Sequence, residues 1–389
     1  ERSHLAAPSI AMVTTWNSRC GIAEYAADLV SGAADNWDIQ IYADRRDQLI
    51  DPTHEEFVTR TWLSDPRAPI SDLLDRLDES PAEIIHVQHN YGFVGLDQLA
   101  ALIRREVDQR AVVITLHRTE DLDTPTLQVH IGDIATDLAL ASRVIVHQWE
   151  DADRLKSVGV DRVEIVPIGA RQFPNIDVET ARRRLGIKVP AGTAIIATYG
   201  FLLPHKGTLQ LIQAIGLMRS RGVSVGLIAV CALHTDPMSA AYERKCRDEI
   251  ECLGLGDSVR LVTEFLAPEV SHLLLSAADV VALPYQDSAE SSSAALRFVL
   301  PVGRAVLASE IGIFHDARES LLMVEAPPTP ALLAAALTNL IEDPSTRDEY
   351  AAKARHLAHQ SSIGNSVAEH TRIYREVVAE RATFDEDMR

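Results

Sequence analysis

Short apolar runs alternate with amphipathic segments along almost the whole chain. In the first half, runs of the length and composition of buried strands are Ser9–Thr14, Ile39–Tyr42, Ile84–Val87, Val112–Leu116, Val144–Val146 and Val163–Val166. In the second half they are Ala194–Tyr199, Val223–Val230, Val259–Val262, Val280–Leu283, Ala305–Ala308 and Leu321–Val324. Segments with helical spacing of apolar positions lie between them, among them Ile22–Val30, Leu96–Val107 and Leu127–Ala139. This alternation is typical of parallel sheets with helices on both faces.

The alternation is interrupted once, around residues 167–174, where Gly169 and two prolines indicate a loop. We therefore predict an α/β protein of two doubly wound, Rossmann-like domains facing a central crevice, residues 1–172 and 173–362. A last helical pattern, residues 363–389, follows the final predicted strand.

Composition narrows the class of protein. The formal net charge is −19, and the basic doublets and triplet are scattered, which argues against a nucleic-acid partner. The four cysteines lack C-x-x-C pairing, as expected in a reducing compartment. No apolar run approaches the roughly 20 residues of a membrane-spanning helix. We expect a cytoplasmic protein, with peripheral contact to a membrane left open.

The stretch from Ala278 to Asp316 carries the strongest functional signal. A short strand ends at Pro284, a polar loop with Glu290 follows, and Ser291, Ser292 and Ser293 precede an apolar helical segment. In a parallel sheet, ligands bind beyond the carboxyl ends of the strands, and helix N-termini favour anions such as phosphate. Helix capping alone would account for at least one of the serines.

Two further signals lie in the first half of the chain. Gly21 begins a predicted helix directly after the first strand, where a missing Cβ lets a ligand approach the backbone; a plain tight turn explains it equally. His117 ends the strand Val112–Leu116 and is either a proton-handling group or a buried structural histidine. His86 and His89 end the preceding strand and could border the same crevice.

The first strand of the second half runs into "YGFLLPHKG", in which Gly200 ends the strand and Lys206 opens a helix. A lysine at a helix start is disfavoured by the helix dipole, so an anion is expected beside it unless the side chain is merely solvated. Neither a dinucleotide fingerprint nor a Walker A loop is present.

Two D-x-D triplets, in the segments Glu120–Asp123 and Glu150–Asp153, could hold a divalent cation against a diphosphate. Since the second begins a helix, where acids favour the dipole, and the first lies in a polar loop, we assign no metal site.

With these pieces in place, the chain resembles the nucleotide-sugar glycosyltransferases of the GT-B fold, particularly the large retaining family 4. In that family "G-R-L-x-x-x-K-G" binds the donor diphosphate; here Lys206 matches and Phe201 replaces the arginine. Of the family's two glutamates, the first matches Glu290 and the second falls on Phe298. Arg297 fits members of the family with a serine-rich loop and "A-L-R".

Other motifs extend the resemblance over nearly the whole chain. "CGIAEY" looks like the family's glycine loop at Gly21, and "ITLH" like the strand whose histidine, here His117, borders the donor sugar. The closing helix is similar to one that crosses back onto the first domain. The resemblance implies an acceptor-side first domain and a donor-binding second domain.

The implied activity is transfer of a sugar from a nucleoside diphosphate sugar to an acceptor hydroxyl, with retention, without metal and without a cofactor. Donor contacts are expected from Gly21, Gly200, Lys206, Glu290, Ser291, Ser292, Ser293 and Arg297. Catalytic roles are expected for His117, Glu290 and Lys206. The acceptor stays open among a glycan, a lipid-linked sugar and a small molecule.

Two alternatives stay open, the first of them because of the missing arginine and glutamate. One is a catalytically silent partner subunit or nucleotide-binding protein with the same fold. The other is a nucleotide-sugar epimerase or hydrolase.

Overall fold

The computed structural model describes residues 7–33, 36–51, 53, 55–124, 128–288 and 290–387. The chain divides into two compact units. Unit 1 comprises the chain up to Gly169, the short segment Glu290–Ser292 and everything from Ile363 on; unit 2 comprises the remaining residues.

Unit 1 is built on a parallel seven-stranded sheet in the order β3-β2-β1-β4-β5-β8-β9. Its elements are β1 (Ser9–Thr14), α1 (Gly21–Ala33), β2 (Asp38–Asp44), β3 (Val58–Trp62), α2 (Ser71–Asp78), β4 (Ile84–His89), α3 (Leu96–Glu106), β5 (Ala111–Leu116), β6 (Leu122–Asp123), β7 (Gln128–Val129), the 3-10 helix η2 (Ile131–Ile134), α4 (Ala135–Leu138), β8 (Arg143–Val146), α5 (Trp149–Ser157), β9 (Val163–Ile165) and α13 (Ile363–Asp387).

Unit 2 is built on a parallel six-stranded sheet in the order β12-β11-β10-β13-β14-β15, the Rossmann order. Its elements are α6 (Val178–Arg184), β10 (Ala194–Phe201), η3 (Pro204–Lys206), α7 (Thr208–Ser220), β11 (Val225–Ala232), α8 (Pro237–Cys252), β12 (Val259–Val262), α9 (Pro268–Ser276), β13 (Val280–Leu283), α10 (Ala294–Val299), η4 (Leu300–Val302), β14 (Ala305–Ser309), η5 (Gly312–Ser320), β15 (Leu322–Val324), α11 (Pro330–Glu342) and α12 (Pro344–Gln360).

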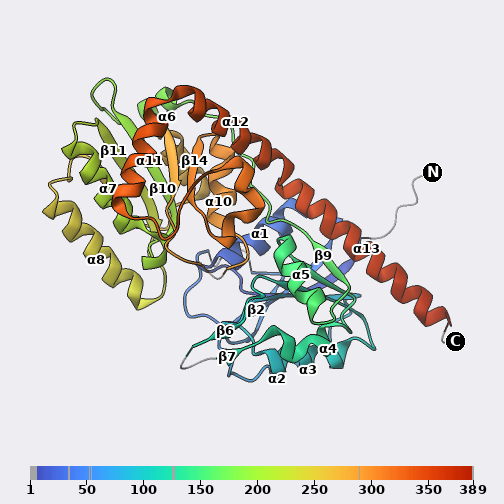
Figure 1. Ribbon diagram of the computed structural model, residues 1–389. Coiled ribbons are helices and arrows are strands. Elements are labelled where there is room, and N and C mark those ends of the chain that lie inside the picture. Colours follow the sequence, from blue (N-terminus) through green and yellow to red (C-terminus); the bar gives the residue numbers. More distant parts are fainter. Residues whose placement is uncertain are drawn as a thin grey trace. The chain divides into compact units, whose positions relative to one another are not determined.

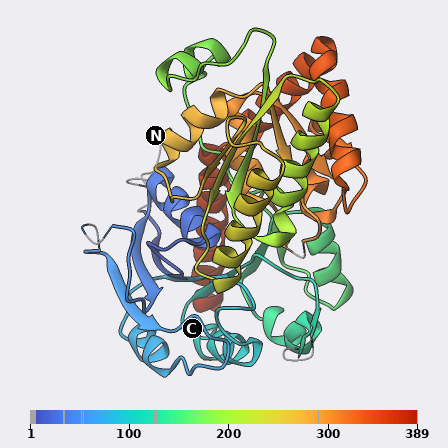
Figure 2. The ribbon, with the colours of Figure 1, turned by 90° about the vertical axis from the view of Figure 1, so that its left-hand side faces the viewer.

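The two doubly wound halves predicted from the alternation are therefore confirmed. Each sheet buries both faces, which is why its strands have near-continuous apolar sequences. In β10, Ile195 faces the cluster that includes α9, α10 and α12, while Ile196 faces the cluster that includes α7, α8 and α11. Figures 1 and 2 show α7 and α8 together on one side of this sheet.

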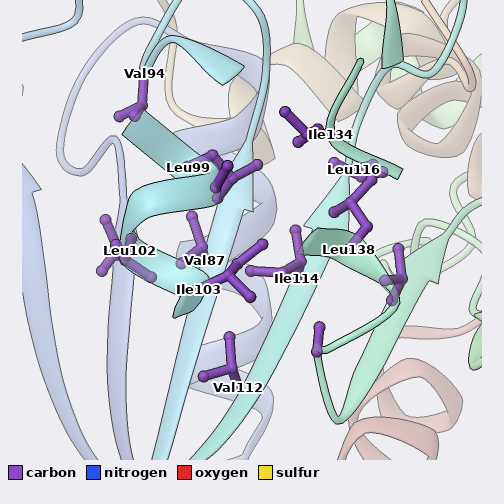
Figure 3. Packing of buried hydrophobic residues seen from close by; sticks show 14 of the residues in the cluster. Val87, Val94, Leu99, Leu102, Ile103, Val112, Ile114, Leu116, Ile134 and Leu138 are labelled. Atoms are coloured by element: carbon purple, nitrogen blue, oxygen red, sulfur yellow. The ribbon is translucent and has the colours of Figure 1, made fainter. Parts of the chain in front are cut away.

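The same alternation organises unit 1. Val112 and Ile114 of β5 face α3, and Val113 faces the side covered by α1 and α13. Figure 3 shows Ile103 of α3 directed toward Ile114, with Val87 beside it. Burying each such side chain contributes about 1.5–3 kcal/mol, so both layers of helices are held mainly by this apolar contact.

Two segments differ from the sequence-based expectation. β3 was not predicted, because its half-polar sequence "VTRTW" has no continuous apolar run. The helix expected over Leu127–Ala139 is replaced by β7 and two short helical turns, and Leu127 itself lies outside the described residues.

The closing helix α13 belongs to unit 1, although unit 2 precedes it in the chain. It begins in close contact with α1, since a Cβ on Gly32 would lie 2.7 Å from Cγ2 of Ile363. Tyr374 and Val377 of α13 are buried against the sheet. Among the described residues, no helix is both long enough and apolar enough to cross a membrane.

Candidate functional site

The end of β10 and the loop after it in unit 2 contain the predicted residues Gly200 and Lys206 and have tight backbone geometry. Gly200 has a φ of 136° near the end of the strand, and Gly207, the N-cap of α7, has a φ of 74°. A Cβ on Gly207 would lie 1.9 Å from the carbonyl oxygen of Pro284, just after β13. Only glycine fits here, so the start of α7 and the loop after β13 are packed backbone to backbone.

This packing places Lys206 over an aromatic ring. The Nζ atom of Lys206 lies 3.9 Å from the ring centroid of Tyr285, a side chain only 1% exposed. The hydroxyl of Tyr285 lies 3.5 Å from the Oγ atom of Ser293. Lys206 and Ser293, far apart in sequence, thus meet at one tyrosine, and the ring's π electrons offset the unfavourable position of the ammonium at a helix start.

The three serines have three different environments. Ser293 caps α10 by accepting a hydrogen bond from the N–H of Leu296 at 3.1 Å, as helix capping alone would predict. Ser291 is buried and donates from its hydroxyl to Oδ1 of Asp151 in unit 1 at 3.1 Å. The Oγ atom of Ser292 is buried without a hydrogen-bond partner among the described residues. Glu290, which precedes them, is exposed.

Arg297, an expected donor contact, is enclosed among residues of its own unit. It is 2% exposed, and its guanidinium forms a salt bridge with Asp316 and donates to Oγ of Ser361 at 3.3 Å. All three residues belong to unit 2. A guanidinium enclosed in this way holds α10 against the helices beside it. Its Nε is buried without a hydrogen-bond partner among the described residues, and the donor contact of Arg297 stays a prediction.

The two phenylalanines that replace the family's polar residues are packed among other rings. Phe201 makes an edge-on contact with His234 at 5.1 Å between centroids and lies nearly parallel to Phe265 at 6.4 Å. Phe298 is stacked on Tyr199 at 4.2 Å, with an interplanar angle of 11°. At both positions, aromatic packing has replaced the charge that the resemblance implies.

His117 lies at the end of β5, as predicted, but both of its ring nitrogens are engaged within unit 1. Nδ1 is 3.0 Å from Nε2 of His147, and Nδ1 of His147 is 2.9 Å from the carbonyl oxygen of Val166. A carbonyl only accepts, so His147 carries its proton on Nδ1 and accepts from His117 Nδ1–H through Nε2.

The remaining ring nitrogen, Nε2 of His117, faces the side-chain amide of Gln88, whose oxygen is 2.8 Å away. Burial, reinforced by His147, holds the pKa of His117 well below its ordinary value, so the ring is neutral and presents a lone pair. The hydrogen bond between His117 and Gln88 forms when Gln88 turns its amide N–H toward this lone pair. A ring bound on both sides orients the strand end, and direct contact between a ring nitrogen and a sugar would require Gln88 to move.

The other histidines considered from the sequence also serve the interior. Nδ1 of His86 lies 2.5 Å from the hydroxyl of Tyr374 on α13, and its Nε2 lies 2.7 Å from Oγ1 of Thr115. His89 is 1% exposed, and its Nε2 donates to the carbonyl of Val94 at 2.9 Å. These rings tie α13 and the loop after β4 to the sheet of unit 1.

Gly21 begins α1 and is half-buried, as the sequence predicts. The loop before it is fixed by Asn17, which has a φ of 53° and accepts at its Oδ1 from the N–H of Asp51 at 2.9 Å. The loop is therefore held in place independently of any ligand.

The D-x-D acids of the first triplet surround a histidine. Asp121 and Asp123 lie 3.3 Å and 3.4 Å from the two ring nitrogens of His130. The hydrogen bond to Asp121 raises the pKa of His130, and the charge of Asp123 adds to the shift. Within the described ranges, no group of three or more His, Cys, Asp or Glu side chains is arranged to hold a metal ion.

Sequence reasoning missed Tyr285, Asp316 and His147 as partners of the predicted residues. Tyr285 had a signal, since it lies two residues beyond a buried strand, at the edge where ligands bind. His147 had one as well, since it directly follows the predicted strand Val144–Val146. Asp316 had none, because the spacing along the chain does not show which side chains meet in the fold.

Comparison with known proteins supports the fold and leaves the substrate open. No family model matches the chain. It is 28% identical over 276 residues to a D-inositol 3-phosphate glycosyltransferase of Corynebacterium glutamicum (strain R). The aligned part is 67% of this chain and 63% of the relative, so the chain spans less than two thirds of that protein.

Solved structures match over nearly the full length. Sucrose-phosphate synthase from Thermosynechococcus elongatus has a TM-score of 0.75 at 18% identity, covering 96% of this chain and 100% of the other. A glycosyltransferase from Rickettsia africae has a TM-score of 0.74 at 13% identity, covering 96% and 99%. HepE of Anabaena, solved with UDP, has a TM-score of 0.69 at 18% identity, covering 93% and 99%. These likenesses confirm the predicted GT-B fold.

Proposed function

We propose that this chain is a glycosyltransferase that moves a sugar from a nucleoside diphosphate sugar to an acceptor hydroxyl. The observation that carries the proposal is the position of Lys206 at the end of η3, directly before Gly207, the N-cap of α7, which is packed against Pro284. The GT-B fold over the full chain and the glycosyltransferase relative at 28% identity support it.

The chemistry proposed for this loop is electrostatic. When the bond between sugar and diphosphate breaks, negative charge accumulates on the leaving phosphate oxygens. Lys206 and the backbone N–H groups at the start of α7 would oppose that charge without needing to reorganise. The Tyr285 ring keeps the ammonium in place before the donor binds.

The remaining donor contacts are assigned by chemistry. Glu290, as an exposed carboxylate, is unsuited to a phosphate and suited to sugar hydroxyls. Ser292 has a buried hydroxyl that lacks a partner among the described residues, and it could bind a donor oxygen. As the resemblance implies, residues 173–362 would bind the donor and residues 1–172 would bind the acceptor.

Retention of anomeric configuration and independence from metal are part of the proposal. They rest on the resemblance to the retaining family 4 and on the cationic loop, which supplies the charge that a divalent cation would otherwise supply. UDP and UDP-glucose are the first donors to test, because HepE of Anabaena was solved with both.

The test is a thermal-shift panel of nucleoside diphosphates and their sugars, followed by product analysis with a bound donor. A ligand that binds the native state raises its melting temperature, and NMR of the product's anomeric proton reports retention or inversion. Turnover without acceptor would instead indicate an epimerase or hydrolase. Binding without turnover over a broad acceptor screen would favour a silent subunit, for which the ring packing at Phe201 and Phe298 is the structural argument.

A further inference from the structure

Unit 1 has a group of polar side chains at the carboxyl edge of its sheet that none of the roles above uses. Tyr91 lies two residues beyond β4, Arg118 two residues beyond β5, and Asp151 and Arg154 lie on α5 after β8. Asp121 lies just before β6. We call these five residues the Tyr91 cluster.

Three atoms of the cluster lack hydrogen-bond partners among the described residues. They are the hydroxyl oxygen of Tyr91, Nε of Arg118 and Oδ2 of Asp151. Tyr91 and Asp151 are only 3% and 2% exposed, so bulk water does not replace the missing partners. Because buried polar groups are nearly always hydrogen-bonded, three such atoms at one sheet edge indicate a bound molecule that completes them.

Arg118, Arg154, Asp121 and Asp151 all lie near enough to Tyr91 for their charges to act on its phenol. The guanidinium of Arg118 lies 5.6 Å from the centroid of the Tyr91 ring. Asp151 is held by Thr119, and Nη1 of Arg154 lies 3.3 Å from its Oδ1. Burial, and then the charge of Asp121, raise the pKa of the Tyr91 phenol, which therefore stays protonated and can donate.

The unsatisfied atoms include both donors and an acceptor. Tyr91 O–H and Arg118 Nε–H donate, whereas Oδ2 of Asp151 accepts. A phosphate only accepts, so it would leave Asp151 unsatisfied and would be repelled by it. A hydroxyl does both. The charges of the five residues cancel, two arginines against two aspartates, and Glu120, 3.5 Å from Nη2 of Arg154, adds a further negative charge.

We propose that the Tyr91 cluster binds a neutral polyhydroxyl acceptor, such as a sugar or cyclitol without a phosphate group. The proposal rests on the proposed glycosyltransferase function for its biological sense. The acceptor is thus expected to differ from the phosphorylated compound in the name of the Corynebacterium relative. Asp121 and Arg154, whose side chains are 52% and 33% exposed, provide the accessible side of the site.

The variant Tyr91→Phe tests this with little risk to the fold, because it removes an oxygen that has no partner among the described residues. Binding of myo-inositol, glucose and their monophosphate esters is measured by calorimetry, with UDP present and absent. We expect the neutral compounds to bind more tightly than their esters. Tyr91→Phe should weaken the binding of the neutral compounds about three- to tenfold, because one uncharged hydrogen bond is lost. Its melting temperature should stay the same or rise.

Tyr42→Phe is the matched control. It also removes a tyrosine hydroxyl from unit 1, one that lies 3.5 Å from the carbonyl of Arg76, and it should leave polyol binding unchanged. Any of three results would overturn the proposal: phosphate esters that bind as tightly as the neutral compounds, no binding by any polyol, or equal polyol affinity of Tyr91→Phe and the unmodified protein. Binding is measured without turnover, so the two proposals can fail separately. A protein that binds polyols but transfers no sugar would reject only the glycosyltransferase function. An active protein in which Tyr91→Phe leaves polyol affinity unchanged would reject only this site.

Discussion

The ammonium of Lys206 lies 3.9 Å from the ring centroid of Tyr285, and this pair links the start of α7 to the loop after β13. A lysine at a helix N-terminus is electrostatically unfavourable, and a buried tyrosine with its face toward the lysine reduces that cost. The same pair sets the position of the cation against which a diphosphate would bind.

Replacing Lys206 with alanine should weaken binding of nucleoside diphosphate about ten- to a hundredfold, since a charged hydrogen bond is worth about 1.5–3 kcal/mol. Turnover should fall further than ground-state binding, because the leaving group gains charge in the transition state. Lys206→Arg should recover part of both. Calorimetry and a turnover assay measure these effects. Unchanged nucleotide affinity in Lys206→Ala would place the donor elsewhere.

Replacing Glu290 with glutamine should reduce turnover with the nucleotide sugar and leave binding of the free nucleoside diphosphate nearly intact. The reason is that a carboxylate accepts hydrogen bonds from sugar hydroxyls but repels phosphate. Parallel titrations with the diphosphate and with its sugar separate the two effects. Equal loss for both ligands would move Glu290 out of the sugar site.

Excess chelator should leave donor binding and turnover unchanged, because the proposed charge stabilisation comes from Lys206 and backbone N–H groups. The assay is repeated with EDTA and then with added Mg²⁺ or Mn²⁺. Loss of activity in EDTA with rescue by either ion would make the D-x-D acids, including Asp121, the first residues to mutate.

Gly207→Ala should destabilise unit 2 strongly. The left-handed backbone at φ 74° costs about 1–2 kcal/mol for a residue with a Cβ, and that Cβ would lie 1.9 Å from the carbonyl oxygen of Pro284. Gly222, after the other end of α7, has a φ of 85° and open space around its missing Cβ. Urea denaturation of Gly222→Ala therefore measures the backbone cost alone. If Gly207→Ala lowers the free energy of unfolding by no more than Gly222→Ala does, the two loops are not in tight contact.

Unit 1 should lose stability in mild acid. Burial lowers the pKa of both His89 and His370 to about 4. Each stays neutral in the folded state while the unfolded chain takes up a proton below about pH 6.5, so each should lower the free energy of unfolding by about 1.4 kcal/mol per pH unit between these values. Urea denaturation from pH 7 to pH 5 measures the slope, and His370→Gln should reduce it by about one proton. A free energy that does not change over this range would contradict the neutral, buried state of these rings.

What the sequence by itself determined is the architecture and the edge of each sheet where chemistry could occur. Strands such as Val280–Leu283 are apolar without interruption because both faces are buried, and this pattern can be read locally. β3 escaped prediction because an edge strand needs no such run.

Only the tertiary structure decided which of the candidate side chains remain available to a ligand. Arg297 matched the family pattern, yet its guanidinium is enclosed with Asp316, and His117 is bound at both nitrogens by residues from neighbouring strands. Tyr91, in contrast, is an ordinary tyrosine in the sequence, and in the fold it is a buried donor without a partner among the described residues. Hydrogen bonds and ion pairs form between residues that are distant along the chain, so spacing can place a side chain at a strand end but cannot show whether its polar atoms are already occupied.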